Sequence, residues 1–482
     1  MKENEKNLVI EINEKPKALP WFFLSVQHVF AMFGATVLVP FLTGMPISVA
    51  LFASGIGTFI YIFCTRGKVP VYLGSSFAYI TAVVYAKTTL GGDISAAQTG
   101  LIIVGLVYVL VAIVIHFIGK EWLDTVLPPI VIGPMIAIIG LGLAPIAVSQ
   151  AGLTGDGSVG AVLVAVITFA ITAIISRYAK GFLKIVPFLF GIIGGYLATI
   201  ILSHFGLVEA IDFTPVMESF KNIIQVPEFA LPFKFGNFTE YKLYFGPETW
   251  AIVPIAFVTI SEHIGDHTVL GKICGKNFLK EPGLDKTLIG DGIATSVSAL
   301  IGGPANTTYG ENTGVVGMTK VGSVYVIAGA ASFAILMSFF TPLNALIKTI
   351  PDPVLGGMSI LLFGVIASNG LRVLVDAKVD FGEQKNLIIA SAMLVIGLGG
   401  AVLKISDLVS LQGMALAAVV GIILNLALTN KRNMFVSISM GIVGIIGLVL
   451  SLNILLIVGL MVCLGIIMYL VMNQTTKNEL EK

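Results

Sequence analysis

The chain has 482 residues and a formal net charge of +1; 56% of its residues are hydrophobic and only 11% are charged. Soluble domains carry roughly 25% charged residues, so this composition excludes an ordinary soluble protein. The net charge says little about partners, and no basic patch suggests a nucleic-acid partner. Apolar runs of about 20 residues, the length that crosses a bilayer, recur from Leu19 to Met472. The runs are continuous and do not alternate, which favours helices and excludes a β-barrel.

The apolar runs predict an all-α polytopic membrane protein with fourteen spans. In chain order the spans begin near residues 19, 47, 70, 98, 124, 159, 183, 249, 286, 304, 321, 354, 386 and 409. Two further apolar runs, 434–451 and 454–472, are separated by only two residues, which predicts an extra C-terminal helical hairpin.

Lysine and arginine gather in alternate loops of this span pattern. The positive-inside rule then places the N-terminus and these loops in the cytoplasm, which predicts a multi-pass protein of the cytoplasmic membrane. The basic segments are residues 15–17, 65–68, 177–184, 271–286, 371–378 and 430–433. The long segment 206–248 has mixed charge and is expected outside.

The fourteen spans divide into two halves of seven, with 206–248 between them. An odd number of spans inverts the second half, and inverted repeats are common in transporters. An offset of 235 residues carries "QH" (27–28) onto "EH" (262–263), and "LGSSFAYI" (73–80) onto "TYGENTGV" (308–315). The same offset places Ser75 on Gly310 and Ser76 on Glu311, so polar interruptions occupy matching places in both halves.

Both interruptions follow a proline and contain a β-prone stretch too short to span a membrane. We therefore expect spans 3 and 10 to be broken, each with a short strand followed by a half-helix. Non-helical backbone at membrane depth is tolerated where it is buried in protein or lines a wet cavity, and half-helix N-termini attract polar ligands. This pattern predicts a binding site between the two broken spans.

Charged residues inside spans are rare and usually face a cavity. Glu262 and Asp266 are four residues apart, which puts both on one face of a helix. With Glu311 they form the notable acidic set. His28, His263 and His267 are expected to be hydrogen-bonded packing residues. Asp291 is expected at a span start, as an interfacial or capping residue.

A carboxyl group held away from water and near other carboxylates favours its protonated form, so a glutamate here could load and release a proton. A protonated carboxyl also offers one donor beside one acceptor. That pair matches the amide-like edge of a flat heterocycle. The acidic set therefore predicts recognition of such a ring together with proton coupling.

Four segments resemble the nucleobase–ascorbate transporter family, in particular its uracil branch. The segment "ENTGVVGMTK" (311–320) resembles the family signature, and "NTTYG" before it resembles the uracil branch, since purine members usually have glutamine in place of Glu311. The segments "QHVFAMFGATVLVP" (27–40), "LGSSFAYI" (73–80) and "SEHIGDHTVLGKI" (261–273) are also similar. The resemblance covers about residues 19–430.

The resemblance implies a core that carries substrate against a gate that also dimerises, with a proton as coupling ion and no cofactor or metal. The implied parts are the N-terminal tail (1–18), core spans 1–4 (19–120), gate spans 5–7 (121–205), the external loop (206–248), core spans 8–11 (249–345), gate spans 12–14 (346–430), and the C-terminal hairpin and tail (431–482).

The resemblance also implies a uracil site and an elevator-type movement of the core within a lipid membrane. The implied substrate-binding residues are Glu262, Glu311, Phe77, Gly310, Ser76 and Tyr309. The implied proton-coupling residues are Glu262, Asp266, His267 and Glu311. The implied supporting residues are His28, Asn312 and Thr313. Some relatives have histidine at the place of Asp266, so either Asp266 or the adjacent His267 relays the proton.

Three other interpretations compete. A permease for xanthine, urate or another purine is the nearest, and Glu311 speaks against it. A facilitative channel is a second, although it needs no buried titratable groups. An intramembrane metalloprotease is the most distant: His263 to His267 reads H-x-x-D-H, close to the H-x-x-E-H zinc pattern, but the sequence offers no convincing third ligand.

Overall fold

The computed structural model describes residues 8–155, 157–406 and 409–429 of the chain. It is mostly helical, and its few strands are two or three residues long. Among the described residues, seven helices are long and apolar enough to cross a membrane, and three apolar helices are shorter. The chain is therefore a multi-pass membrane protein. The predicted hairpin of 434–472 lies outside the described residues.

One order of elements, helix–helix–strand–helix–helix, occurs near the N-terminus. Pro70 precedes the strand, and proline disfavours a continuing helix because it lacks an amide hydrogen. A 3-10 turn then leads from the strand into the next helix. The elements are α1 (Ala18–Thr43), α2 (Ile47–Cys64), β1 (Leu73–Ser75), η1 (Phe77–Tyr79), α3 (Ile80–Thr89) and α4 (Ser95–Ile118).

The same order occurs again in the second half of the chain. Pro304 precedes the strand there, and the strand itself consists of asparagine and threonine. The elements of this order are α13 (Ala256–Cys274), α14 (Leu284–Leu300), β4 (Asn306–Thr308), α15 (Gly310–Thr319) and α16 (Val324–Phe339). The short elements α12 (Pro247–Trp250) and η2 (Val253–Ile255) precede α13, and η3 (Leu279–Gly283) lies between α13 and α14.

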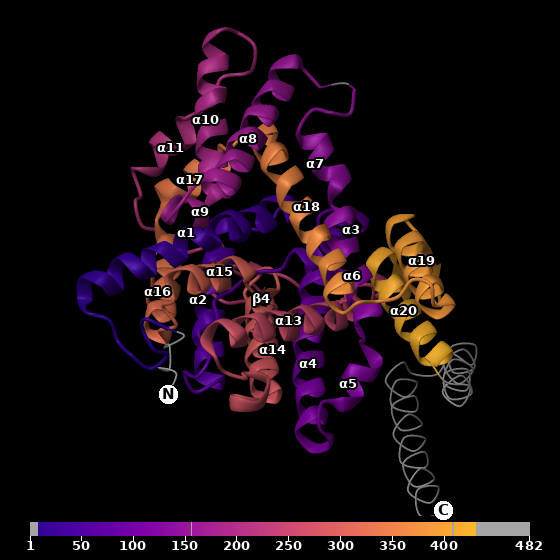
Figure 1. Ribbon diagram of the computed structural model, residues 1–482. Coiled ribbons are helices and arrows are strands. Elements are labelled where there is room, and N and C mark those ends of the chain that lie inside the picture. Colours follow the sequence, from indigo (N-terminus) through magenta and orange to yellow (C-terminus); the bar gives the residue numbers. More distant parts are fainter. Residues whose placement is uncertain (1–7, 156, 407–408, 430–482) are drawn as a thin grey trace, which may run out of the picture.

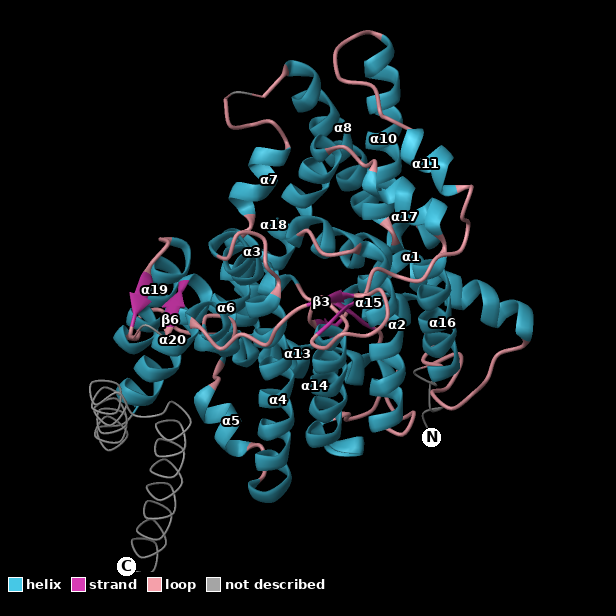
Figure 2. Ribbon diagram, turned by 180° about the vertical axis from the view of Figure 1, so that it is seen from behind, coloured by secondary structure: helices cyan, strands magenta, loops and turns pink. Residues whose placement is uncertain are grey.

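The two series of elements interlock as one bundle, the strand-bearing bundle, made of α1–α4 and α13–α16. β1 and β4 pair antiparallel, with Leu73 opposite Thr308 and Ser75 opposite Asn306. The second helix of each series packs against the fourth helix of the other, α2 against α16 and α14 against α4. β4 lies between α13 and α15 in Figure 1, and β1 packs against α1 and α2. Figure 2 shows the same helices from behind.

Gly74 marks a close approach inside this bundle. A Cβ at Gly74 would collide with the aromatic ring of Tyr309, so only glycine lets β1 lie directly on that ring. Tyr309 in turn is 3% exposed, and its hydroxyl donates to the Ser75 carbonyl at 3.0 Å. The ring of Tyr309 thus fixes the distance between β1 and the start of α15.

The remaining helices form a second bundle around the long helix α18. α18 packs along α6, α7 and α8, and α19 packs on α20 and α6. In Figure 1 the second bundle lies above and beside the strand-bearing bundle. Its elements are α5 (Glu121–Val126), α6 (Pro129–Gly142), α7 (Ala144–Gln150), α8 (Val159–Tyr178), α9 (Phe182–Ile185), α10 (Pro187–His204), α17 (Thr341–Lys348), α18 (Asp352–Asp376), α19 (Gln384–Leu398) and α20 (Gly413–Thr429).

Three details differ from the sequence prediction. The separation of corresponding elements is not constant at 235 residues: it falls from 238 between the starts of α1 and α13 to 229 between α4 and α16, because the connecting loops differ in length. The span expected from residue 409 is preceded by a hairpin of β5 (Val402–Lys404) and β6 (Ser410–Gln412). Segment 206–248 contains α11 (Thr214–Ser219) and the parallel pair β2 (Ala230–Leu231) and β3 (Thr239–Glu240).

Candidate functional site

One face of α13 carries two carboxyl groups beside unfilled space. Glu262 and Asp266 are both half-buried, and Gly265 between them is exposed. Nothing lies within 4 Å of where a Cβ on Gly265 would be. Residues three and four apart share a helix face, so the two carboxylates border the same open space.

The first turn of α15 has the same combination of a carboxylate and open glycines. Gly310 is exposed and Glu311 is half-buried. No atom would contact a Cβ at Gly310 or at Gly314. The partial positive charge at a helix N-terminus favours an acidic side chain in the first turn, which stabilises Glu311 at this position.

The structure brings these acidic residues together. The carboxyl group of Glu262 is close enough to those of Asp266 and Glu311 for their charges to interact, and Asp266 also interacts with Glu311. Among the described residues, the Glu262 carboxyl has no hydrogen-bond partner. Three neighbouring carboxyl groups thus lie on α13 and α15 beside glycines with open space, and among the described residues none of the three forms an ion pair.

Two side-chain hydrogen bonds hold α13 against β4 and against η1, which follows β1. The Thr308 hydroxyl of β4 donates to Asp266, with 2.5 Å between Oγ1 and Oδ2. On the other side, the hydroxyls of Tyr79 and Thr259 are 2.8 Å apart. α13 is therefore joined to β4 by one bond and to the segment after β1 by the other, and neither contact was foreseen from the sequence.

Between each strand and the helix that follows it, one backbone amide already has a hydrogen-bond partner. The Ser76 amide donates to the Ala305 carbonyl at 2.9 Å, and the Tyr309 amide donates to the Tyr72 carbonyl at 3.1 Å. The Ser76 hydroxyl is buried and has no partner among the described residues. Ser76 is thus placed beside β4, while the side chain of Tyr309 points toward β1 and away from the open space.

Phe77 lies where the two bundles meet. Its side chain is half-buried, and its ring contacts Phe363 of α18 edge to face, with 6.2 Å between ring centroids. Edge-to-face pairs are a favoured aromatic geometry. Gly364, next to Phe363, is exposed and faces open space. The second bundle therefore contributes an aromatic side chain that contacts Phe77, one of the implied substrate-binding residues.

Asn312 and His28 form a supporting contact between α15 and α1. The Asn312 amide nitrogen lies 3.0 Å from the His28 carbonyl and 3.1 Å from its Nδ1 atom. Both side chains are 1% exposed, and Thr313 beside them is also buried. The predicted supporting residues thus lie together behind the first turn of α15.

His267 does not join the acidic set. It is fully buried, its Nδ1 lies 2.7 Å from the His263 carbonyl, and its Nε2 bonds the Tyr61 hydroxyl. A nitrogen that faces a carbonyl must carry the proton, so Nε2 accepts from Tyr61. Asp266, by contrast, lies beside the open space.

Asp291 is the clearest error of the sequence analysis. It is not interfacial: it is fully buried in α14 and bonds His263, with 2.8 Å between Oδ2 and Nδ1. The other oxygen of Asp291 and Nε2 of His263 have no partner among the described residues. The only signal in the sequence was an aspartate in a glycine- and threonine-rich apolar helix, and hydropathy alone could not give its depth.

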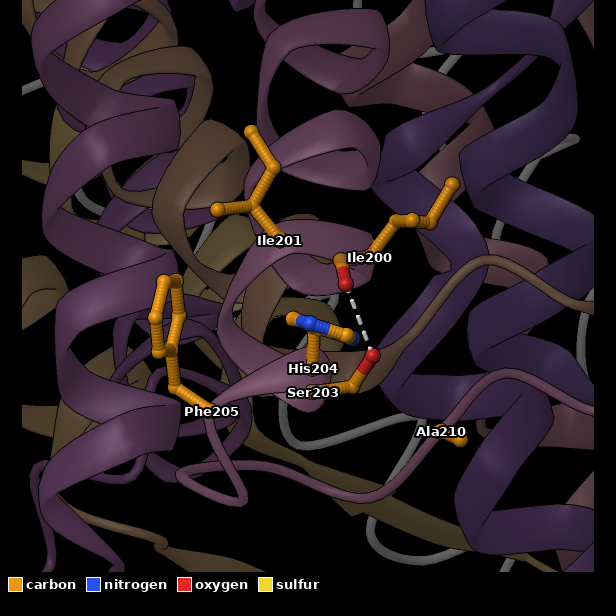
Figure 3. Close-up of a pocket in the computed structure, with 6 residues that line it drawn as sticks. All are labelled: Ile200, Ile201, Ser203, His204, Phe205 and Ala210. Carbon is orange, nitrogen blue, oxygen red and sulfur yellow. Dashed lines mark hydrogen bonds between the residues drawn. The ribbon is translucent and has the colours of Figure 1, made fainter.

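Two further features lie apart from the acidic set. Figure 3 shows an open hollow at the end of α10 and in the loop after it, without an acidic lining residue. Its lining consists of Ile200, Ile201, Ser203, His204, Phe205 and Ala210. Across the described residues, no group of three or more His, Cys, Asp or Glu side chains is arranged to hold a metal ion.

Comparison with known proteins gives consistent matches over most of the chain. The sequence family Xan_ur_permease, described as "Permease family", matches residues 19–406. The chain is 48% identical to a uracil permease of Bacillus caldolyticus over 88% of this chain and 95% of that protein. It is 46% identical to a uracil permease of Bacillus subtilis over 89% and 97% of the two chains.

The fold is similar to that of a solved membrane transporter. The transmembrane domain of the cyanobacterial bicarbonate transporter BicA aligns with a TM-score of 0.56 at 16% identity, and the match covers 86% of this chain and 98% of that domain. At this identity the likeness concerns the arrangement of helices alone.

Proposed function

This chain belongs to the permease family that matches residues 19–406, and on that premise we propose that it carries uracil across the cell membrane in symport with protons. Its relatives are permeases, so it is a transporter and not an enzyme. The observation that carries the proposal is the set of three carboxyl groups on α13 and α15, which lie near one another beside glycines with unfilled space.

Uracil is flat and uncharged, and its edge alternates N–H donors with carbonyl acceptors. In the proposed site, Glu262 and Glu311 bind this edge from two helices. The backbone of Phe77 and Gly310 supplies further hydrogen bonds. Gly310 can do so because it is exposed at the start of α15. Phe77 and Phe363 offer ring faces and edges to a planar base.

Proton coupling follows from the charge of the same site. Three neighbouring carboxylates repel one another away from bulk water, so uptake of a proton lowers the free energy of the loaded site. We assign the relay to Asp266, because it borders the open space and contacts β4, whereas His267 is buried against Tyr61. No metal or other cofactor is required.

The proposed architecture has fourteen spans in two inverted halves. The repeated order of elements and the reciprocal packing of α2 with α16 and α14 with α4 support this arrangement. The spans containing β1 and β4 are the interrupted ones. Transport then moves the strand-bearing bundle against the second bundle, and the second bundle forms the homodimer contact. We place the N-terminus in the cytoplasm and the lipid around both bundles.

Uptake of labelled uracil into cells that express the chain tests the proposal. Glu262→Gln and Glu311→Gln should each abolish uptake at unchanged membrane level, because the amide cannot hold the proton. Glu240→Gln, at an exposed residue of β3, is the matched control and should take up uracil normally. A protonophore should collapse accumulation, and purines should compete poorly; full uptake by both site variants would refute the assignment.

A further inference from the structure

The described chain begins with an extended segment that lies along the connection between α15 and α16. Residues 8–14 run beside residues 320–324, and Ile10 forms a parallel bridge with Val321. The amides of Val9 and Ile10 both donate to the Lys320 carbonyl, at 2.7 and 3.4 Å. We call residues 8–14 the N-terminal strap.

The connection between the helices depends on the strap for its own backbone bonds. The Gly322 amide donates to the Ile10 carbonyl at 2.9 Å, and the Val324 amide donates to the Ile12 carbonyl at 3.0 Å. Buried backbone groups without partners are costly. Removing the strap would leave these amides and the Lys320 carbonyl unpaired at the end of α15.

Two apolar side chains seal the strap into the strand-bearing bundle. Leu8 and Ile12 are each 2% exposed, while Val9 between them is 75% exposed. Their buried neighbours come from α2, β1, α13, α15 and α16, and include Tyr61, Leu73, Leu270, Cys274, Val316 and Val324. The strap therefore joins elements from both halves of the chain.

Gly322 lets the strap approach closely. A Cβ on Gly322 would lie 2.7 Å from a methyl carbon of Leu8 and 3.6 Å from Ile12. A larger side chain at residue 322 would therefore push the strap away without altering the strap itself. The contact can therefore be tested by substitutions in the strap and by a substitution at residue 322.

We propose that the N-terminal strap positions α15, and with it Glu311, by fixing the far end of this ten-residue helix. The β4 ladder holds the start of α15, and the strap holds its end. A short helix fixed at both ends cannot tilt, so the Glu311 carboxylate stays directed at the site. The strap is thus a positioning element, outside the acidic set itself.

Thiol labelling tests the contact independently of transport. Cys274 is 4% exposed in the same cluster as Leu8 and Ile12. In a chain with Cys64→Ser and Cys463→Ser, Cys274 is the only remaining thiol. Leu8→Asp should speed maleimide labelling of Cys274 in the purified full-length protein by at least about tenfold, because a charge there releases the strap. Val9→Asp, one residue away, should label at the parental rate.

Gly322→Leu is the second variant, and it should speed labelling like Leu8→Asp. Equal labelling of the Leu8→Asp and Val9→Asp proteins would overturn the contact. The positioning role rests on the proposed uracil transport. Leu8→Asp should raise the KM for uracil about tenfold, whereas the conservative variant Leu8→Met should keep the parental KM. Fast labelling with an unchanged KM would overturn positioning alone. If the parental chain took up no uracil, the proposed function would be wrong. The labelling rates would still show whether the strap packs on the cluster around Cys274.

Discussion

Thr308 and Asp266 are joined by a hydrogen bond of 2.5 Å between Oγ1 and Oδ2. It links β4, which precedes Glu311, to the helix that carries Glu262. A bond to a charged group contributes more than one between neutral groups. Glu262 and Glu311 are therefore kept at a set separation by Thr308, a residue that need not touch the substrate.

Thr308→Val removes this hydroxyl and keeps the shape of the side chain. Loss of a bond to a charged group costs about 1.5–3 kcal/mol, so uracil uptake should fall by about tenfold or more. Thr307→Val is the matched control, because Thr307 is also buried but its hydroxyl has no partner among the described residues. Equal uptake by the two variants would show that the Thr308–Asp266 hydrogen bond is not needed for transport.

Asp266→Asn tests which group couples transport to protons. If Asp266 relays the proton, the variant should still exchange labelled for unlabelled uracil across vesicle membranes but should no longer accumulate it under an imposed pH gradient. Asp285→Asn, an acid at the start of α14 that pairs with the exposed His116, should accumulate uracil normally. Gradient-driven accumulation by Asp266→Asn would move the assignment to another carboxylate.

Asp291→Ala tests the buried pair with His263. Removing one partner of a buried pair leaves the other unsatisfied, so the free energy of unfolding should fall by about 3–5 kcal/mol. Thermal unfolding of the purified protein in detergent measures this. Asp285→Ala, which removes a pair with the exposed His116, should change stability by no more than about 1 kcal/mol. A double variant of His263 and Asp291 that is as unstable as the sum of the single variants would argue against direct pairing.

Gly314→Ala tests whether the open space beside Glu311 is used. Nothing stands within 4 Å of the added methyl group, and alanine is a better helix former than glycine, so stability should not decrease. Uracil uptake should nevertheless fall, because the methyl group occupies part of the site. Gly142→Ala, at the last residue of α6 and also facing open space, is the control and should leave uptake intact. Normal uptake by Gly314→Ala would place uracil elsewhere.

The sequence predicted those parts of the structure that leave a local pattern. Apolar runs located the helices, and proline followed by glycine, serine or threonine located the two short strands β1 and β4. The acidic face of α13 followed from the spacing of Glu262 and Asp266. Each of these depends on neighbouring residues alone.

The polar partners of the site could not be predicted, because they join residues far apart in the chain. Thr308 meets Asp266 and Tyr79 meets Thr259 only after the two halves have packed. The burial of Asp291 depends on where α14 begins and on which face meets α13. The uneven spacing of the two halves depends on loop lengths, which tertiary packing sets.

The β1–β4 ladder also constrains how the protein is made. Its strands begin 233 residues apart, and a ribosome completes the first long before the second. Until Asn306–Thr308 has been synthesised, the edge of Leu73–Ser75 has no partner strand, and the hydrocarbon of a bilayer offers its peptide groups no substitute. Until then, the peptide groups of β1 must be hydrogen-bonded by water, by the insertion machinery or by side chains of the first half of the chain.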